Sequence, residues 1–173
     1  MALQWLFVQV AAPPSAPGAL TAARDEGQTV LSWNAATGAT GYNIKRSTTN
    51  GGGYVMIAQD VTALSYTNTG LSNGTMYYFV VSGTNSGGES PNSPQAAVQP
   101  VSLAPALMGS IFSGGQLRLS WPADHRGWYL QVQTNTNGIG TNWHDWPGTA
   151  GTNVFSLPLN KSNPTLFLRL TSP

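Results

Sequence analysis

The tripeptide Leu-Ser-Trp occurs twice in the chain, at residues 31–33 and again at residues 119–121. Each copy closes a short run in which apolar and polar residues alternate. Each is followed by a glycine and an aromatic residue that open a second such run, at Gly41 and at Gly127. Alternation with a period of two is typical of strands that bury one face. The repeat therefore predicts two related β-modules in tandem, and it favours binding or spacing over catalysis by an enzyme-sized domain.

The composition excludes several classes of partner. Charged residues make up 8% of the 173 residues, against about 25% in typical globular chains. The seven Lys and Arg residues form no basic stripe, which argues against nucleic acid and against a membrane surface. No apolar run reaches the ~20 residues of a membrane-spanning helix. The chain has no cysteine, which excludes disulfides and thiolate metal sites. A surface of Ser, Thr, Asn and Gly favours an extracellular, secreted location.

Prolines and apolar runs divide the chain into three parts. Residues 1–12 are apolar but are interrupted by Gln4 and Gln9 and lack the basic start of a signal peptide. They are predicted to be an apolar strand or the tail of an upstream domain. Residues 13–100 and 101–173 are then expected to form two tandem antiparallel β-sandwiches of the immunoglobulin-like class. Strand signals recur at short intervals in both, and no window has a helical period.

The alternating runs of residues 13–100 predict seven strands. The turn at Asn50–Gly53 separates the third from the fourth, because glycine adopts positive φ without steric cost. The expected strands are Leu20–Arg24, Thr29–Asn34, Gly41–Ser47, Tyr54–Ala58, Ser65–Thr67, Met76–Gly83 and Gln95–Val98.

Several ordered motifs make this first module resemble a fibronectin type III domain. Residues 31–33 supply a core tryptophan in the second strand, and Tyr42–Arg46 matches the third strand. Leu71–Val81 matches the family's corner-tyrosine strand, and Asn85–Ser90 matches the loop after it. The resemblance implies that Tyr77 is the corner tyrosine, with its hydroxyl bonded to nearby backbone. Such domains often follow catalytic domains in secreted hydrolases. The chain has no Arg-Gly-Asp, so integrin binding has no support here.

The second module follows the order of the first but ends one strand earlier. Trp128 falls on the position of Tyr42 and is predicted to be a core residue, as are the tryptophans of the two Leu-Ser-Trp copies. This half also resembles a small C-terminal β-module of large secreted bacterial proteins, through Ser120–Ala123, Gly127–Asn135 and Asn142-Trp143. That resemblance implies no known activity. The expected strands are Ala106–Phe112, Gln116–Trp121, Gly127–Thr134, Trp143–Trp146, Asn153–Leu157 and Leu166–Thr171.

A sandwich without its last strand leaves an apolar strand edge unpaired, and proteins usually cover such edges. Leu3–Val10 is one candidate to cover it, either within the chain or between neighbouring chains. The alternative is that Leu3–Val10 is the tail of an upstream catalytic domain. The sequence leaves both open.

The residues that carry common catalytic and metal chemistry form no convincing constellation. The six carboxylates include no pair that the spacing places across a cleft, as glycoside hydrolysis requires. Two His-Asp neighbours, Asp124-His125 and His144-Asp145, make no chelating pair if they lie on strands, because adjacent side chains then point to opposite faces. No Gly-x-Ser-x-Gly elbow is present. We predict no catalytic residue, no metal ligand and no cofactor.

Aromatic residues provide the remaining signal, in a segment rich in asparagine. Carbohydrate-binding surfaces usually stack sugar rings on flat aromatic side chains. Nearby amide side chains form hydrogen bonds with the sugar hydroxyls. Trp143 and Trp146 are three residues apart, so a regular strand places them on opposite faces, one in the core and one exposed. The alternative for the whole segment is packing beneath a glycine-rich loop. The candidate carbohydrate-binding residues are Tyr129, Trp143, Trp146, Asn135, Asn137 and Asn142.

Two functions from different classes follow. The first is a non-catalytic accessory region of a secreted bacterial polysaccharide-degrading enzyme, which acts as a spacer and a weak carbohydrate-binding module. Its expected partners are a polysaccharide and an upstream catalytic domain. The second is a structural or adhesive module that engages a protein partner by strand addition. The sequence leaves the oligomeric state open.

Overall fold

The structure is a computed structural model, and it describes residues 11–134, 138–159 and 165–172. Contacts divide the chain into two compact units. The second unit begins at Gln99 and also takes in two turn segments, Arg24–Gln28 and Thr69–Thr75. None of the described helices has the length and apolar character needed to cross a membrane. The expectation that Leu3–Val10 forms a strand lies outside the described residues.

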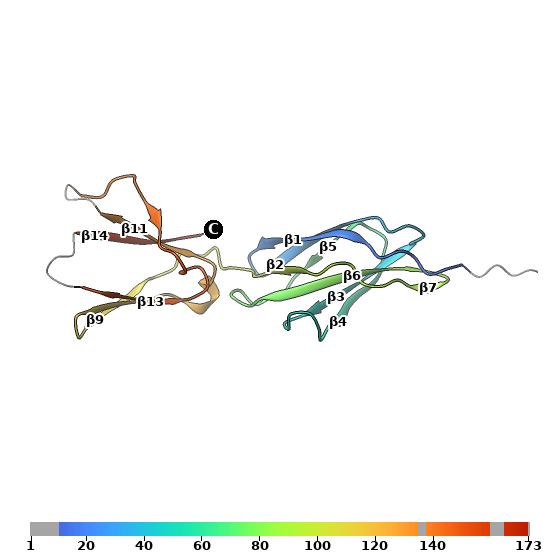
Figure 1. Ribbon diagram of the computed structural model, residues 1–173, viewed down its shortest axis with the longest axis horizontal. Coiled ribbons are helices and arrows are strands. Elements are labelled where there is room, and N and C mark those ends of the chain that lie inside the picture. Colours follow the sequence, from blue (N-terminus) through green and yellow to red (C-terminus); the bar gives the residue numbers. More distant parts are fainter. Residues whose placement is uncertain (1–10, 135–137, 160–164, 173) are drawn as a thin grey trace, which may run out of the picture. The chain divides into compact units, whose positions relative to one another are not determined.

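The first unit is a sandwich of two antiparallel sheets (Figure 1). One sheet has the order β1-β2-β5. The other has the order β4-β3-β6-β7, and β8 also pairs with β6. The strands are β1 (Gly18–Asp25), β2 (Gln28–Asn34), β3 (Gly41–Ser47), β4 (Val55–Val61), β5 (Ser65–Asn68), β6 (Tyr77–Asn85), β7 (Gly88–Glu89) and β8 (Ala96–Val98).

The core of this unit lies between the two sheets and is centred on the first repeated tryptophan. Alternate residues of β2 are buried, so Leu31 and Trp33 face inward while their neighbours face solvent. The Trp33 ring meets the Tyr42 ring edge to face, with centroids 5.5 Å apart. The Tyr42 hydroxyl accepts a hydrogen bond of 3.0 Å from the amide of Ala36. The expectation of a core tryptophan at this position is confirmed.

The last strand of the first unit is split in two, whereas the sequence predicted one strand at Gln95–Val98. Pro91 and Pro94 lie between β7 and β8 and have no N–H to donate to β6. Two serine side chains take part in the ladder in this stretch. The Ser90 hydroxyl accepts from the Gly83 amide at 2.8 Å, and the Ser93 hydroxyl accepts from the Val81 amide at 3.1 Å. The segment thus stays beside β6 although it is not a regular strand.

The described residues of the second unit repeat this arrangement without a counterpart of β7 and β8 (Figure 1). Its sheets have the orders β13-β10-β9 and β12-β11-β14, which correspond to β5-β2-β1 and β4-β3-β6 of the first unit. Among its described residues, no strand lies beside β14 as β8 lies beside β6. The all-β class and the tandem sandwiches are confirmed. The elements are β9 (Gly109–Ser113), β10 (Gln116–Ser120), η1 (Ala123–His125), β11 (Tyr129–Thr134), β12 (His144–Asp145), β13 (Val154–Pro158) and β14 (Leu166–Thr171).

β9 and β12 are shorter than the sequence predicted, and both limits have a local cause. β9 begins at Gly109 because its partner β10 ends opposite it at Ser120, where Trp121-Pro122 turns the chain into η1. β12 contains only His144–Asp145, because the Trp143 amide donates to the Thr141 carbonyl in a turn. The Trp146 amide still reaches the Leu130 carbonyl at 2.7 Å, and Pro147 follows it.

The core of the second unit is centred on the second repeated tryptophan. Leu119, Trp121 and Leu130 are buried together. Trp128 is also buried, as expected, and its indole N–H donates to the Ser102 carbonyl at 2.9 Å. The remaining apolar side chains that pack on this cluster are only partly buried. They are Met108, Leu117, Trp146, Phe155, Leu168 and Leu170.

Candidate functional site: the outer face of the sheet β12-β11-β14

The direction of the β11 side chains defines an outer face on this sheet. Leu130 is fully buried, so the residues on either side of it in β11, Tyr129 and Gln131, point away from the core. Directly opposite residues of neighbouring strands share a face. Gln131 lies opposite Asp145 of β12 and opposite Arg169 of β14. Three strands therefore place polar side chains of both charges side by side.

These three side chains form a hydrogen-bonded row across the outer face, which we call the Asp145–Gln131–Arg169 row. Gln131 Nε2 donates to Asp145 Oδ1 at 2.7 Å. Arg169 Nε donates to Gln131 Oε1 at 2.7 Å. The amide thus joins a carboxylate at one end to a guanidinium at the other, and all three groups remain open to solvent. Such a row offers both donors and acceptors to the hydroxyls of a ligand.

An aromatic ring completes the outer face at its β12 edge. Trp143 is half-buried, and the guanidinium carbon of Arg169 lies 4.4 Å from the centroid of its ring. This cation–π contact fixes the ring orientation and covers one of its faces. Tyr129, also half-buried, lies on the same face of β11 as Gln131. Two rings therefore flank the Asp145–Gln131–Arg169 row.

The structure separates the two tryptophans that the sequence placed on opposite faces of a strand. Trp146 packs against the core of the second unit, and its ring lies 4.8 Å from that of Phe155. Trp143 is the outer one. Asn142 is exposed next to Trp143, while Asn135 and Asn137 lie outside the described residues. Of the predicted site residues, Tyr129, Trp143 and Asn142 thus lie on or beside the outer face, and Trp146 does not.

Sequence reasoning missed Gln131, Asp145 and Arg169 as members of one group. The alternation of side chains along β11 could have identified Gln131, because residues two apart on a strand share a face and Gln131 is two residues after Tyr129. The pairing of β14 with β11, which brings Arg169 to that face, depends on a contact between segments 38 residues apart.

The two histidines differ in their surroundings. His144 is exposed on β12. His125 is buried on η1 rather than on a strand, where its Nδ1 lies 2.7 Å from Asp124 Oδ1 and its Nε2 lies 2.8 Å from the Ala104 carbonyl. Both ring nitrogens of His125 are therefore engaged within the unit. Across the described ranges, no group of three or more His, Cys, Asp or Glu side chains is placed to hold a metal ion.

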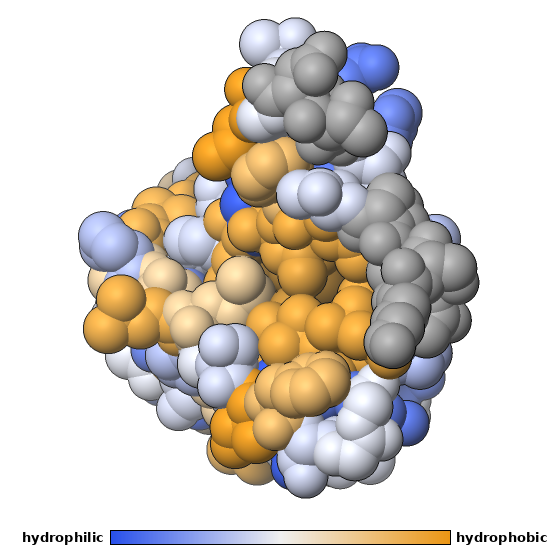
Figure 2. Space-filling view, turned by 90° about the vertical axis from the view of Figure 1, so that its left-hand side faces the viewer, coloured by the Kyte–Doolittle hydropathy of each residue, from blue (hydrophilic) through white to orange (hydrophobic). Residues whose placement is uncertain are grey.

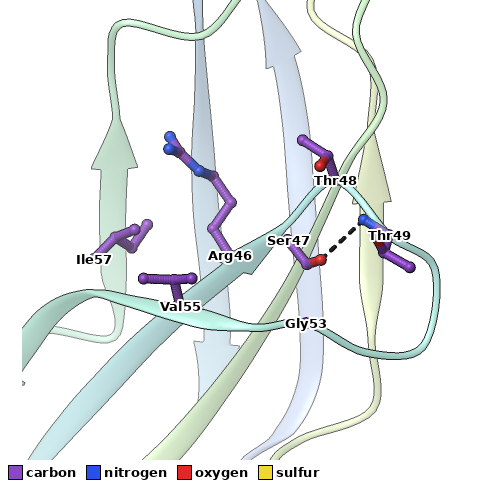
Figure 3. A pocket seen from close by; sticks show the side chains of 7 residues that line it. All are labelled: Arg46, Ser47, Thr48, Thr49, Gly53, Val55 and Ile57. Atoms are coloured by element: carbon purple, nitrogen blue, oxygen red, sulfur yellow. Dashed lines mark hydrogen bonds between the residues drawn. The ribbon is translucent and has the colours of Figure 1, made fainter.

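A pocket of about 300 Å³ lies on the first unit at the β3–β4 hairpin (Figure 3). Val55 and Ile57 lie on one side of Arg46, and three hydroxyl-bearing residues lie on the other. The Arg46 guanidinium is already engaged, because Nη1 donates to Asn68 Oδ1 at 3.0 Å and the group stacks on Tyr77 at 5.4 Å. Its charge is thus held by the fold, and we assign no ligand to this pocket.

Comparison with known families matches residues 15–99 to the fibronectin type III domain. Residues 15–99 belong to the fibronectin type III family. In this fibronectin type III domain Tyr77, the position expected for the corner tyrosine, is buried beneath Arg46.

Similar segments occur in larger proteins. Amylopullulanase of Thermoanaerobacterium saccharolyticum is 38% identical over 88 residues, which is 50% of this chain and 7% of that protein. Amylopullulanase of Thermoanaerobacter thermohydrosulfuricus is 40% identical over 82 residues, which is 47% of this chain and 6% of that protein. A solved Fn3-like protein from Clostridium thermocellum is 44% identical over 54% of this chain and 99% of that chain, with a TM-score of 0.49. The chain thus spans under a tenth of the length of these amylopullulanases.

Proposed function

We propose that this chain is a non-catalytic accessory region of a secreted bacterial polysaccharide-degrading enzyme. In this role the fibronectin type III domain is a spacer, and the second unit binds carbohydrate weakly. The relatives support the accessory role, because the matched segment is a small part of proteins named for the degradation of a polysaccharide. The proposed partners are an upstream catalytic domain and a neutral polysaccharide.

The outer face of the sheet β12-β11-β14 carries the carbohydrate-binding part of the proposal. Sugars present C–H faces to aromatic rings and hydroxyls to amides and charged groups. Tyr129 and Trp143 supply rings, and the Asp145–Gln131–Arg169 row supplies donors and acceptors between them. Binding is weak in this proposal because the surface lies on a sheet face and because Arg169 already occupies one side of the Trp143 ring.

Affinity electrophoresis tests this surface directly. We expect the chain to be retarded in native gels that contain a neutral polysaccharide, with pullulan, amylopectin, mixed-linkage glucan and xylan as the panel. Tyr129→Ala and Trp143→Ala should each weaken binding by about fivefold, since one stacked ring contributes about 1 kcal/mol. Tyr78→Ala is the matched control, because it removes a half-buried aromatic from a strand of the fibronectin type III domain.

The two parts of the proposal fail separately. A chain that no polysaccharide of the panel retards would overturn carbohydrate binding and leave the spacer role. Equal loss of retardation in Tyr78→Ala and Trp143→Ala would place the binding surface elsewhere. The spacer role is checked by the coding sequence upstream of Met1, where we expect a polysaccharide hydrolase domain. An unrelated upstream sequence would contradict it.

A further inference from the structure

Three Asn-Gly pairs occur in the chain, at residues 50–51, 73–74 and 137–138. Such pairs are chemically labile, because glycine has no side chain to keep its nitrogen away from the asparagine side chain before it. The glycine nitrogen can form a bond to the asparagine Cγ and close a cyclic succinimide. Asn137 lies outside the described residues. The first two pairs are described completely, and their surroundings differ.

The pair Asn50 and Gly51 lies at the tip of the β3–β4 hairpin, where it is open to water. Both residues are exposed. The φ of Gly51 is 76°, and among the described residues no atom beyond its chain neighbours lies within 4 Å of the place that a Cβ would take. The pair is therefore accessible to a base that removes the nitrogen proton and to the water that opens a succinimide.

One side chain, that of Gln95, holds both groups that would react. Gln95 Nε2 donates to Asn50 Oδ1 at 2.7 Å, and Gln95 Oε1 accepts from the Gly51 amide at 2.9 Å. Closing the succinimide requires the asparagine side chain to turn toward the glycine nitrogen. It also requires that nitrogen to lose its proton. The two hydrogen bonds to Gln95 oppose both changes, because each must break before the ring can close.

Tyr54 fixes the direction in which the Gln95 amide points. Its hydroxyl donates to Gln95 Oε1, the same oxygen that accepts from Gly51, and Nε2 is thereby left to face Asn50. Partial burial raises the pKa of the Tyr54 hydroxyl above its ordinary value of 10.0. The hydroxyl thus keeps its proton in mildly alkaline solution, where base promotes succinimide formation. The hold on the pair therefore persists under the conditions that favour the reaction.

The pair Asn73 and Gly74 is held by backbone groups instead. Asn73 Oδ1 accepts from the Gly27 amide at 2.8 Å, and the Gly74 amide donates to the Pro100 carbonyl at 2.7 Å. Both residues of the pair are also half-buried. Releasing them requires the backbone of other segments to move, whereas the hairpin pair is released when one exposed side chain, Gln95, swings away.

We propose that Asn50 is a site of spontaneous conversion to aspartate and isoaspartate, and that Gln95 sets the rate of this conversion. The Gly51 nitrogen gives its proton to a base in solution and forms a bond to Asn50 Cγ. The Cγ–Nδ2 bond breaks, and the departing nitrogen takes a proton from solvent and leaves as ammonia. Water then opens the succinimide at either carbonyl, which yields aspartate or isoaspartate. Isoaspartate lengthens the main chain of the turn by one methylene group.

Peptide mapping by mass spectrometry tests the proposal on the full chain in mildly alkaline buffer, with Asn50 and Asn73 followed in the same sample. Gln95→Ala removes both hydrogen bonds. We expect conversion at Asn50 to become at least about fivefold faster, the ratio that corresponds to one hydrogen bond of about 1 kcal/mol. Gln59→Ala is the matched control, because it removes an exposed glutamine from β4. Conversion at Asn73 should be equally slow in all three proteins.

The comparison uses dilute samples, because the second unit exposes apolar side chains. Figure 2 shows hydrophobic side chains gathered around a hollow on the side that it presents, and Ile111 and Phe112 are 65% and 64% exposed. Light scattering before and after incubation verifies that the three proteins have the same mass. A difference in rate at Asn50 is then not caused by association.

Each of three results would overturn the proposal. Equal rates at Asn50 in Gln95→Ala and in the full chain would show that the hydrogen bonds do not control the conversion. Equal acceleration at Asn50 and Asn73 would show that Gln95→Ala acts by unfolding the chain. An Asn50 that stays intact in Gln95→Ala would show that the position is not a site of modification.

Discussion

At the scale of single residues, Trp33 and Trp121 hold equivalent places and share an unusual feature. Their side chains are 4% and 3% exposed, and neither indole N–H has an acceptor among the described residues. A buried donor without a partner costs about 1–3 kcal/mol. Burial of about 150–250 Å² of ring contributes about 4–6 kcal/mol at about 25 cal/mol per Å². The free energy gained by burying each ring therefore exceeds the cost of its unpaired N–H, so each tryptophan stabilises its core through packing.

The ion pair between Lys45 and Glu89 makes a pH-dependent contribution to the fibronectin type III domain. Lys45 Nζ lies 2.6 Å from Glu89 Oε1, and the Ser82 hydroxyl also donates to this carboxylate. These bonds, the one from Lys45 first, lower the pKa of Glu89 from its ordinary value of 4.5. A lowered folded-state pKa means that the stabilisation is present above pH 4.5 and is lost as the pH falls below it through the folded value.

We therefore expect the melting temperature of the full chain to fall more steeply below pH 4.5 than that of Glu89→Gln. The pH-dependent part of the difference in free energy of unfolding between the two proteins should be under about 1 kcal/mol, because the carboxylate is 38% exposed and solvent screens the pair. Calorimetry at a series of pH values measures it. Parallel pH profiles of the two proteins would show that the pair does not couple folding to protonation.

At the scale of elements, the strands could be predicted from the sequence wherever one face is apolar and a turn residue follows. β2, β3 and β10 were predicted nearly to their ends, because alternation fixes which face is buried. The strand β7 and the late start of β9 were not predicted, because each depends on pairing with another strand. The Asp145–Gln131–Arg169 row was not predicted for the same reason, since its members come from three strands. Alternation assigned Trp143 and Trp146 to opposite faces but did not say which faces the core.

The serine hydroxyls between β7 and β8 should contribute to stability as acceptors in the ladder. Ser93→Ala removes the acceptor of the Val81 amide, whose residue is fully buried. We expect a loss of about 1–3 kcal/mol in the free energy of unfolding, measured by urea denaturation of the full chain. Ser86→Ala is the control, since Ser86 is exposed and should change stability by less than about 0.5 kcal/mol. Equal effects of the two changes would contradict a role for the hydroxyl.

At the scale of the whole molecule, two hydrophobic cores exist where the repeated tripeptide predicted two modules. Leu31 lies two residues before Trp33 in the first core, and Leu130 is buried together with Trp121 in the second. Both leucines are fully buried. In the second core three apolar side chains are buried and six that pack on them are only partly buried, whereas most of the buried apolar side chains among the described residues belong to the first unit. We infer that the second unit is the less stable of the two and that each core unfolds as a unit.

Leu31→Ala and Leu130→Ala test the separation of the two cores. Each should cost about 2–5 kcal/mol and accelerate hydrogen exchange only in the unit that carries it. Exchange followed by mass spectrometry resolves the two units by their peptides, with the unchanged unit as the internal control. Acceleration in both units from either substitution would show instead that the chain unfolds as one cooperative body.

The prolines at positions 91 and 94 have a consequence for the growing polypeptide on the ribosome. They lie in the irregular segment between β7 and β8, where a regular edge strand would present a continuous row of amides. Neighbouring nascent chains on one messenger expose identical edges at high local concentration, and such edges pair readily. An edge interrupted by two residues without an N–H resists this pairing. We therefore expect nascent copies of the fibronectin type III domain to pair less readily along this edge than they would along a regular strand.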